Sequence, residues 1–217
     1  MHRLFLLIFL LPWYAVAVLT ALMLWFATSQ METAQDAEAQ KAQALQADMP
    51  LPVPIDQFAQ TDRHIADEVH VTAWINLAHN YRLTHRGKFG TDEWMMYVLF
   101  GPDDPDTGKV ARGVALIDPD RIDDFALMMV DALRPEMGSQ LNFDINGQAL
   151  GYGDYSSLVT GALKEHGLTK DPDFLVIAPF IDGRAAGLAP DPLAVMHRAG
   201  GAFALGGARF PFGRPTH

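Results

Sequence analysis

An uninterrupted apolar run near the start of the chain most constrains what this sequence can form. The run extends from Leu4 to Phe26, 23 residues without a charge. As a helix it would measure about 35 Å, and a bilayer core requires about 20 residues. It is longer than the roughly 7–15-residue apolar region of a secretory signal, and the nearest small-x-small site, at residues 27–29, matches a cleavage site poorly. We therefore predict that residues 1–27 form a retained transmembrane anchor that contacts the lipid bilayer through residues 4–26.

The charges that flank this run predict its orientation. Arg3 precedes it, whereas Glu32 and Asp36 follow it and the next basic residue is Lys41. Basic flanks stay in the cytoplasm, so we expect a cytoplasmic N-terminus and an external domain. Arginine outnumbers lysine eleven to five and no Asn-x-Ser/Thr site occurs, which indicates a GC-rich bacterium. The expected location is the bacterial inner membrane, with the domain in the periplasm.

Composition narrows the chemistry. The chain has no cysteine, which excludes disulfides, a thiolate nucleophile and Cys-ligated metals. Its net charge is −10, and every acidic residue lies between Glu32 and Asp191. Nucleic-acid binding requires a basic face, so the acidic body argues against nucleic acid as a partner.

Residues 28–54 are expected to connect the anchor to the domain. Their first part is rich in Ala, Gln and Glu, which favour helix, but it lacks a broad apolar face. Two interpretations remain open: a solvated helical stalk that continues the membrane helix, or a frayed linker. The sequence MPLPVP at residues 49–54 should end any helix and act as a stiff extended spacer.

The segment from residue 55 to residue 192 has the size and patterning of one folded domain. Residues 69–77 alternate apolar and polar side chains, which predicts a strand that extends to Leu83 with a bulge. Residues 93–101 predict its hairpin partner. Strand and helix patterns then alternate in the order strand 112–118, helix 118–135, strand 140–145, helix 154–167 and strand 173–180.

This order predicts the fold class. Two strand–helix–strand units imply two right-handed crossovers, and the initial hairpin makes the sheet mixed. We expect an α/β (or α+β) fold, a mixed-sheet α/β sandwich of about five strands, without an internal repeat. The pair Asn146-Gly147 is expected to end the strand before it, and Gly167 to end the second helix.

The polar motifs of the domain are better explained by structure than by chemistry. None of the histidines has zinc-ligand spacing, including His70, His79, His85 and His166. The sequence GPDDPDTG at residues 101–108 resembles a calcium loop but places Pro, Thr and Val at ligand positions. We therefore expect no metal site.

Two further motifs lie at helix starts. In DPDRIDD, residues 118–124, Asp120 is expected to cap the helix while Asp123 and Asp124 complement its dipole. In GYGDYSS, residues 151–157, Ser156 replaces the third glycine of a phosphate-binding loop, and Asp154 introduces a negative charge where a phosphate would bind. We expect capping turns, no bound cofactor and no catalytic residue.

Residues 193–217 form a Gly-rich tail that has no acidic residue. It interleaves phenylalanines with arginines, and its predicted partner-binding residues are Phe203, Arg209, Phe210, Phe212 and Arg214. Exposed phenylalanines favour burial, so the tail is expected to dock. It would dock either on its own acidic domain or in a partner subunit, where the rings would act as anchors.

Two classes of function fit these features. The first is a non-enzymatic, membrane-anchored accessory or assembly subunit of an integral membrane protein complex, which accounts for the anchor, the stalk, the acidic domain and the tail. The second is a periplasmic enzyme or ligand-binding domain whose pocket lies at the carboxyl ends of the parallel strands. Its candidate residues are Asp118, Tyr152, Asp154 and Asp182.

Overall fold

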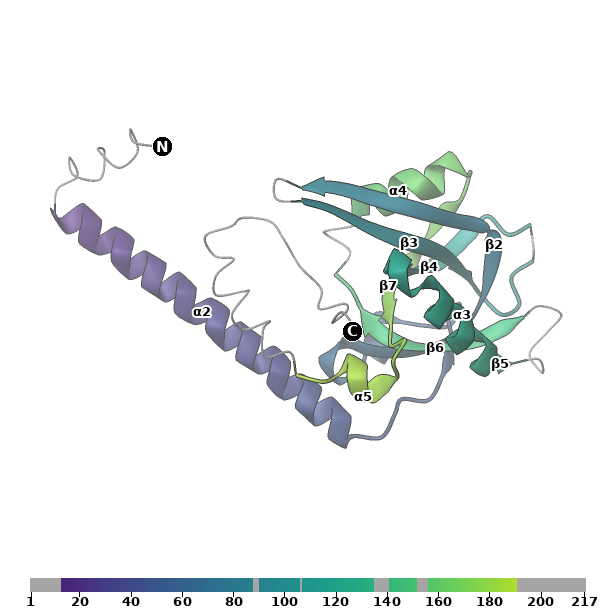
Figure 1. The fold of residues 1–217 in the computed structure, drawn as a ribbon, viewed down its shortest axis with the longest axis horizontal. Coiled ribbons are helices and arrows are strands. Elements are labelled where there is room, and N and C mark those ends of the chain that lie inside the picture. The colour runs from purple at the N-terminus through teal and green to yellow at the C-terminus, as the bar shows by residue number, and fades with distance from the viewer. Residues whose placement is uncertain (1–12, 88–89, 106, 135–140, 152–155, 191–217) are drawn as a thin grey trace. The chain divides into compact units, whose positions relative to one another are not determined.

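The protein is described by a computed structural model that covers residues 13–87, 90–105, 107–134, 141–151 and 156–190. The described residues fall into two compact units, residues 13–39 and residues 40–190. Both are drawn in Figure 1.

The long helix α2 runs from Trp13 to Gln46. Residues 28–46 are helical, which agrees with the helical one of the two interpretations left open, and the helix ends before the proline-containing segment, as the sequence predicts. Large apolar side chains on α2 from Val18 to Phe26 are exposed. Over the described residues, no helix is both long and apolar enough to cross a bilayer. Residues 4–12 of the predicted anchor lie outside the described part of the chain.

The second unit is built on a sheet that closes on itself. Its five main strands are β2 (Glu68–Gly87), β3 (Gly90–Phe100), β4 (Val110–Ile117), β6 (Asn142–Ala149) and β7 (Thr169–Pro179). They follow the order β2-β3-β4-β7-β6, and β6 also pairs with β2, which completes the ring (Figure 1). Two two-residue strands, β1 (Val53–Pro54) and β5 (Leu133–Arg134), pair at the margins with β2 and β6.

The ring has a Greek-key connection. Strands β2, β3 and β4 form successive antiparallel pairs, and β6 returns to lie antiparallel beside β2, which is the order that defines a Greek key. Strand β7 then joins β4 in parallel and β6 in antiparallel pairing. Five-stranded Greek-key barrels include the OB-fold, a plan that serves many functions and by itself assigns none.

Strand β2 pairs with two of the main strands because of its length. Its first part, Glu68–Trp74, pairs with β6, and its later part pairs with β3. The register shifts between Ile75 and Asn80, which confirms the predicted bulge. A bulge bends a strand and increases its twist, so one strand can leave one neighbour and follow another around the barrel.

Within the described residues, three helices accompany the barrel. They are α3 (Ile122–Asp131), α4 (Ser156–Glu165) and the short α5 (Arg184–Gly187). Single 3-10 turns lie at Gln60–Asp62, Ile65–Asp67 and Pro119–Arg121. Gly167 has a φ of 67° just after α4, a left-handed conformation common at helix ends, and it confirms the predicted stop.

The mixed α/β class and the sequence of elements are confirmed, but the predicted sandwich is wrong. Among the five main strands only β4 and β7 pair in parallel. Strand β6 inserts antiparallel between β7 and β2, so the two strand–helix–strand units are not two parallel crossovers. The predicted end of β6 at Asn146-Gly147 is also wrong, because the strand continues to Ala149.

The core fills the barrel and the space beneath α3. Its fully buried side chains come from all five main strands, and α3 adds Phe125 and Met129. The strand residues with 0% exposure include Val69, Val71, Leu99, Ile145, Leu175 and Ile177. His70, Thr72 and Trp74, on the other face of β2, are also buried, because neighbouring segments cover that face as well.

Two glycines allow close approach of strands. A Cβ on Gly113 would lie 2.6 Å from the carbonyl oxygen of Leu175, and one on Gly147 would collide with the carbonyl oxygen of Ala178. Glycine inside a strand often marks a place where another backbone comes close. These two positions therefore set how tightly β7 packs against β4 and β6.

Candidate partner-binding surface

The sequence motif DPDRIDD forms the start of α3. Asp118 accepts a hydrogen bond from the backbone N–H of Asp120 at 2.9 Å, and Pro119 begins the 3-10 turn that leads into the helix. The cap is therefore Asp118 rather than Asp120, because the extra 3-10 turn moves the start of the helical segment toward the strand. Asp123 and Asp124 do lie in the first turn of α3, as predicted.

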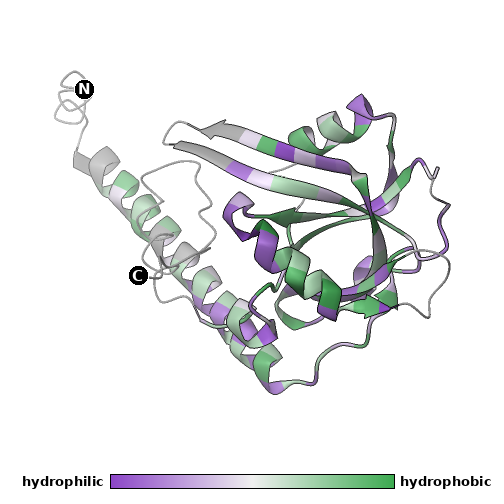
Figure 2. Cartoon of the chain, turned by 45° about the vertical axis from the view of Figure 1, so that its right-hand side comes forward, coloured by the Kyte–Doolittle hydropathy of each residue, from purple (hydrophilic) through white to green (hydrophobic). Residues whose placement is uncertain are grey.

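Helix α3 is apolar on more than the face that meets the core. Phe125 and Met129 are buried, but Leu127 and Val130 are 68% and 70% exposed. Figure 2 shows a hydrophilic start to the helix, followed by hydrophobic residues through its later turns. Residues 127 and 130 are neighbours on a helix surface, so they form an apolar ridge that the described fold leaves open.

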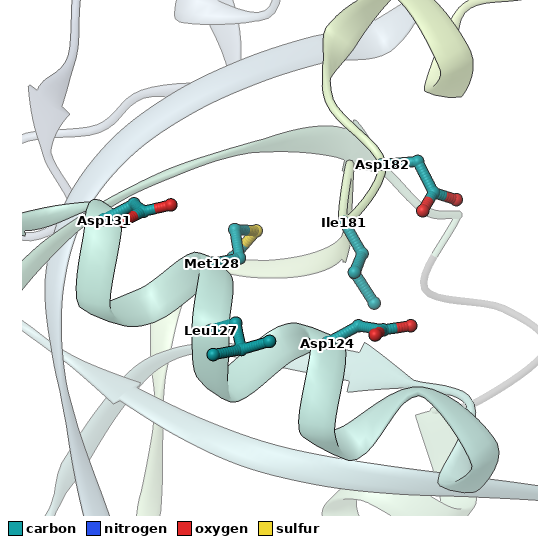
Figure 3. A pocket seen from close by; sticks show the side chains of 6 residues that line it. All are labelled: Asp124, Leu127, Met128, Asp131, Ile181 and Asp182. Atoms are coloured by element: carbon teal, nitrogen blue, oxygen red, sulfur yellow. The ribbon is translucent and has the colours of Figure 1, made fainter.

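A shallow hollow of about 330 Å³ lies between α3 and the segment that follows β7. Ile181 extends from that segment toward the helix, where Leu127 and Met128 border the same space (Figure 3). Three carboxylates frame these apolar side chains: Asp124, Asp131 and Asp182. We call these six residues the α3 hollow.

Arg121 fixes one end of the α3 hollow. Its guanidinium donates to Asp182 through both Nη1 and Nη2, and its Nε donates to Asp124 Oδ2 at 2.6 Å. The hydrogen bond from Arg121 is the main reason that the pKa of Asp182 lies below its usual value, and it outweighs the effect of burial. The rim of the α3 hollow therefore combines three aspartate side chains with one guanidinium.

Two of the four candidate residues of the alternative ligand pocket lie at the carboxyl ends of the parallel strands, where that pocket was predicted. Strands β4 and β7 are parallel, and Asp118 and Asp182 follow their carboxyl ends. Asp118 caps the turn before α3, and Asp182 is bound by Arg121. Tyr152 and Asp154 lie outside the described residues.

The loop GPDDPDTG is organised by an arginine. Asp104 accepts hydrogen bonds from the Gly101 N–H at 2.8 Å and from Arg112, which also pairs with Asp171. Burial alone would raise the pKa of Asp104, but the hydrogen bonds from Arg112 and Gly101 and the charge of Arg112 lower it. Asp104 of this loop is thus part of an ion-pair network with Arg112 and Asp171.

The histidines are spread over several contacts. His70 Nδ1 lies 2.7 Å from the carbonyl oxygen of Pro50, and His79 Nδ1 lies 3.1 Å from the hydroxyl of Tyr81. The ring of Tyr81 contacts that of His166 at 4.4 Å. Across the described part of the chain, no group of three or more His, Asp and Glu side chains is arranged to hold a metal ion.

A buried polar cluster around Glu68 was not predicted from the sequence. Glu68 is 1% exposed and accepts from Arg184 Nε at 2.7 Å and from Asn146 Nδ2 at 3.1 Å. Arg184 also donates to the backbone carbonyls of Ala44 and Ala47 at the end of α2. Nearby, Ala44, Ala66, Phe180 and Leu188 form a small apolar cluster. A charged residue at a strand start carries no sequence signal that its partner lies more than a hundred positions away.

The five predicted partner-binding residues of the tail, Phe203, Arg209, Phe210, Phe212 and Arg214, lie outside the described residues. Comparisons with protein-family models, with curated proteins and with solved structures find no match for this chain.

Proposed function

We propose that this chain is a single-pass, membrane-anchored periplasmic accessory or assembly subunit of a larger bacterial inner-membrane protein complex, and that it acts by binding rather than by catalysis. The observation that carries the proposal is the α3 hollow with its neighbouring ridge. Leu127 and Val130 expose most of their side chains beside Ile181 and Met128. Apolar surface framed by polar groups is typical of protein–protein contact sites.

The start of the chain supports the membrane part of the proposal. Residues 4–26 are free of charge, and α2 exposes Val18, Leu22, Leu24 and Trp25 by more than half. A helix that is apolar on all sides requires an apolar surrounding. The basic residue before this segment and the acidic residues after it favour a cytoplasmic N-terminus and a periplasmic domain.

The tail supports the partner part of the proposal. Three phenylalanines alternate with Arg209 and Arg214 in a stretch without acidic residues. Aromatic and arginine side chains are enriched among the residues that dominate binding energy at interfaces. We propose Phe203, Arg209, Phe210, Phe212 and Arg214 as a second contact with the complex.

A periplasmic enzyme or ligand-binding domain is the alternative function. It is favoured by one observation, the position of Asp118 and Asp182 after the two parallel strands. Both carboxylates already serve structural contacts, which makes this the weaker proposal.

The main experiment is purification of the full chain from membranes in a mild detergent, with mass spectrometry of the proteins that accompany it. We expect an integral membrane protein in a fixed ratio, and we expect it to be lost when residues 200–217 are deleted while the melting temperature of the chain is kept. A chain that purifies alone from gently solubilised membranes would contradict the proposal.

A second measurement tests the anchor by itself. Mass analysis of the N-terminal peptide of membrane-extracted protein should find Met1 or His2. A mature N-terminus near residue 30 would show that residues 1–27 are a cleaved signal.

A further inference from the structure

The α3 hollow has a chemistry that selects among partners. We propose that it binds a cationic segment of a partner protein, which inserts one large apolar side chain between Leu127 and Ile181 and places Lys or Arg side chains beside the rim carboxylates. This inference rests on the proposed function, and it specifies the kind of partner segment that the subunit recognises.

The apolar part of the α3 hollow suits one anchoring side chain. Its volume of about 330 Å³ is at the lower end of the range of ligand pockets. The space is bordered by Leu127 and Met128 from the helix and by Ile181 from the segment opposite (Figure 3). A methionine adapts its shape easily, so Leu, Met or Phe could each fill this space.

The charges determine what must surround that anchor. Asp124 and Asp182 hold Arg121 by three hydrogen bonds, which keeps the guanidinium at one end of the hollow. At the other end is Asp131 (Figure 3), which has no ion-pair partner within the described residues. A segment that enters beside Asp131 therefore meets uncompensated negative charge.

Charge complementarity at an interface steers encounter and excludes wrong partners. An acidic segment, a nucleic acid or an anionic lipid would bring like charge against Asp131 and Asp182. A basic segment gains attraction at both ends of the hollow. The binding should therefore weaken with salt, because the rim carboxylates are exposed and exposed charges are screened.

The test measures binding of a defined probe to the full chain in detergent, with protein-free micelles as the blank. The probe is a short fluorescent peptide that carries a central Phe between arginines. Two companion peptides replace either every Arg with Glu or the Phe with Ala. We expect binding of the first peptide only, with an affinity that falls as salt is added.

Two substitutions locate the binding. Leu127→Gln keeps a good helix former but removes the apolar border, and it should weaken binding about tenfold. Asp131→Asn removes one exposed charge and should weaken it about twofold to fivefold.

Matched controls carry the same changes elsewhere. Leu77 is 70% exposed on β2, and Asp103 lies in the loop before β4, at the strand end opposite α3. Leu77→Gln and Asp103→Asn should leave the affinity unchanged, and all four variants should keep the melting temperature within a few degrees.

Three outcomes would overturn the inference. The peptide does not bind the full chain; or it binds Leu127→Gln as tightly as the unchanged chain; or it binds only after residues 199–217 are removed, which would show that the tail of the chain itself is the occupant. If the peptide binds as expected but no complex co-purifies, the inference stands and the proposed function fails. If the complex co-purifies but Leu127→Gln has no effect on the peptide, the reverse holds.

Discussion

Arg184 and Arg121 form two clusters that look alike but differ in their surroundings. Each arginine has a side chain that is 19% exposed, and each grips one carboxylate with two N–H groups. The carboxylate of Glu68 is 1% exposed, whereas that of Asp182 is 62% exposed. The same kind of arginine–carboxylate ion pair can therefore be part of the interior in one place and part of a surface in another.

Burial decides what each cluster does. Around Glu68 every strong contact is internal: Arg184, Asn146 and the last turn of α2. Around Asp182 one side of the carboxylate pairs with Arg121 and the rest faces solvent beside apolar side chains. The first cluster joins the last turn of α2 to the barrel, and the second leaves charge available for a partner. Four substitutions test this difference, from the largest expected effect to the smallest.

Removal of Arg184 should cost the most. Arg184→Ala leaves the buried carboxylate of Glu68 without its cation and exposes the carbonyls of Ala44 and Ala47. Breaking one side of a buried ion pair typically costs about 3–5 kcal/mol, so thermal unfolding should shift down by on the order of 10 °C. The double variant Arg184→Met with Glu68→Gln should recover part of the loss. An unchanged melting temperature for Arg184→Ala would remove the distinction between the two clusters.

The closely packed strands beside Glu68 should also lose stability when a single methyl group is added. Gly147→Ala places a methyl group against the carbonyl of Ala178, and such overpacking costs about 1–3 kcal/mol. The control is Gly161→Ala inside α4, where nothing lies within 4 Å of the new methyl group. That change should stabilise by roughly 0.5–1 kcal/mol. Chemical unfolding of both variants checks the sign, and equal behaviour would contradict the close strand approach.

Asp104 provides an intermediate case, with a side chain 20% exposed. Its pKa lies below the ordinary 3.8, so its ion pairs stabilise the fold above that pH and are lost as the pH falls through the lowered pKa. Asp104→Asn should be less stable at pH 7 by about 1 kcal/mol. The gap to the unchanged chain should close at a pH below 3.8 in acid-unfolding curves. A gap that is constant with pH would assign the loss to packing.

Arg121→Ala should have the smallest effect on stability. Asp124 and Asp182 return to water when the arginine is removed, because both are more than half exposed. Exposed pairs contribute about 0.2–1 kcal/mol, which differential scanning calorimetry would register as a shift of a few degrees. A loss as large as that of Arg184→Ala would mean that the α3 hollow is a structural joint rather than a surface.

Local patterns predicted the elements of the domain well, since alternation along β2 and helical spacing along α3 are properties of short segments. Ring closure depends on how β6 pairs with β2, between residues some seventy positions apart, and no local pattern encodes that choice. The turn signal of Asn146-Gly147 was overridden because Gly147 is needed for close approach to β7.

The candidate site was predicted only in part. The helical pattern over residues 118–135 predicted the helix that contains α3, and Asp182 was a candidate residue of the alternative ligand site at the strand ends. In the sequence, Leu127 and Val130 cannot be distinguished from the buried apolar residues of the helix. Their exposure becomes visible only in the structure, where the side of α3 that faces the core is known. The tail remains a prediction, because residues 191–217 lie outside the described part of the chain.

Because β2 pairs with both β3 and β6, it also affects the order in which the barrel can form during synthesis. Val71 pairs with Ile145, so during synthesis its partner emerges 74 residues later. At about 5–20 residues per second, the first half of β2 waits roughly 4–15 s with an open edge of apolar residues. For that interval the nascent chain displays a strand edge of the kind that invites pairing with other chains. Any helper that shields this protein during biogenesis would therefore be needed from the appearance of β2 until β7 has emerged, because β7 fills the gap between β4 and β6 and closes the ring.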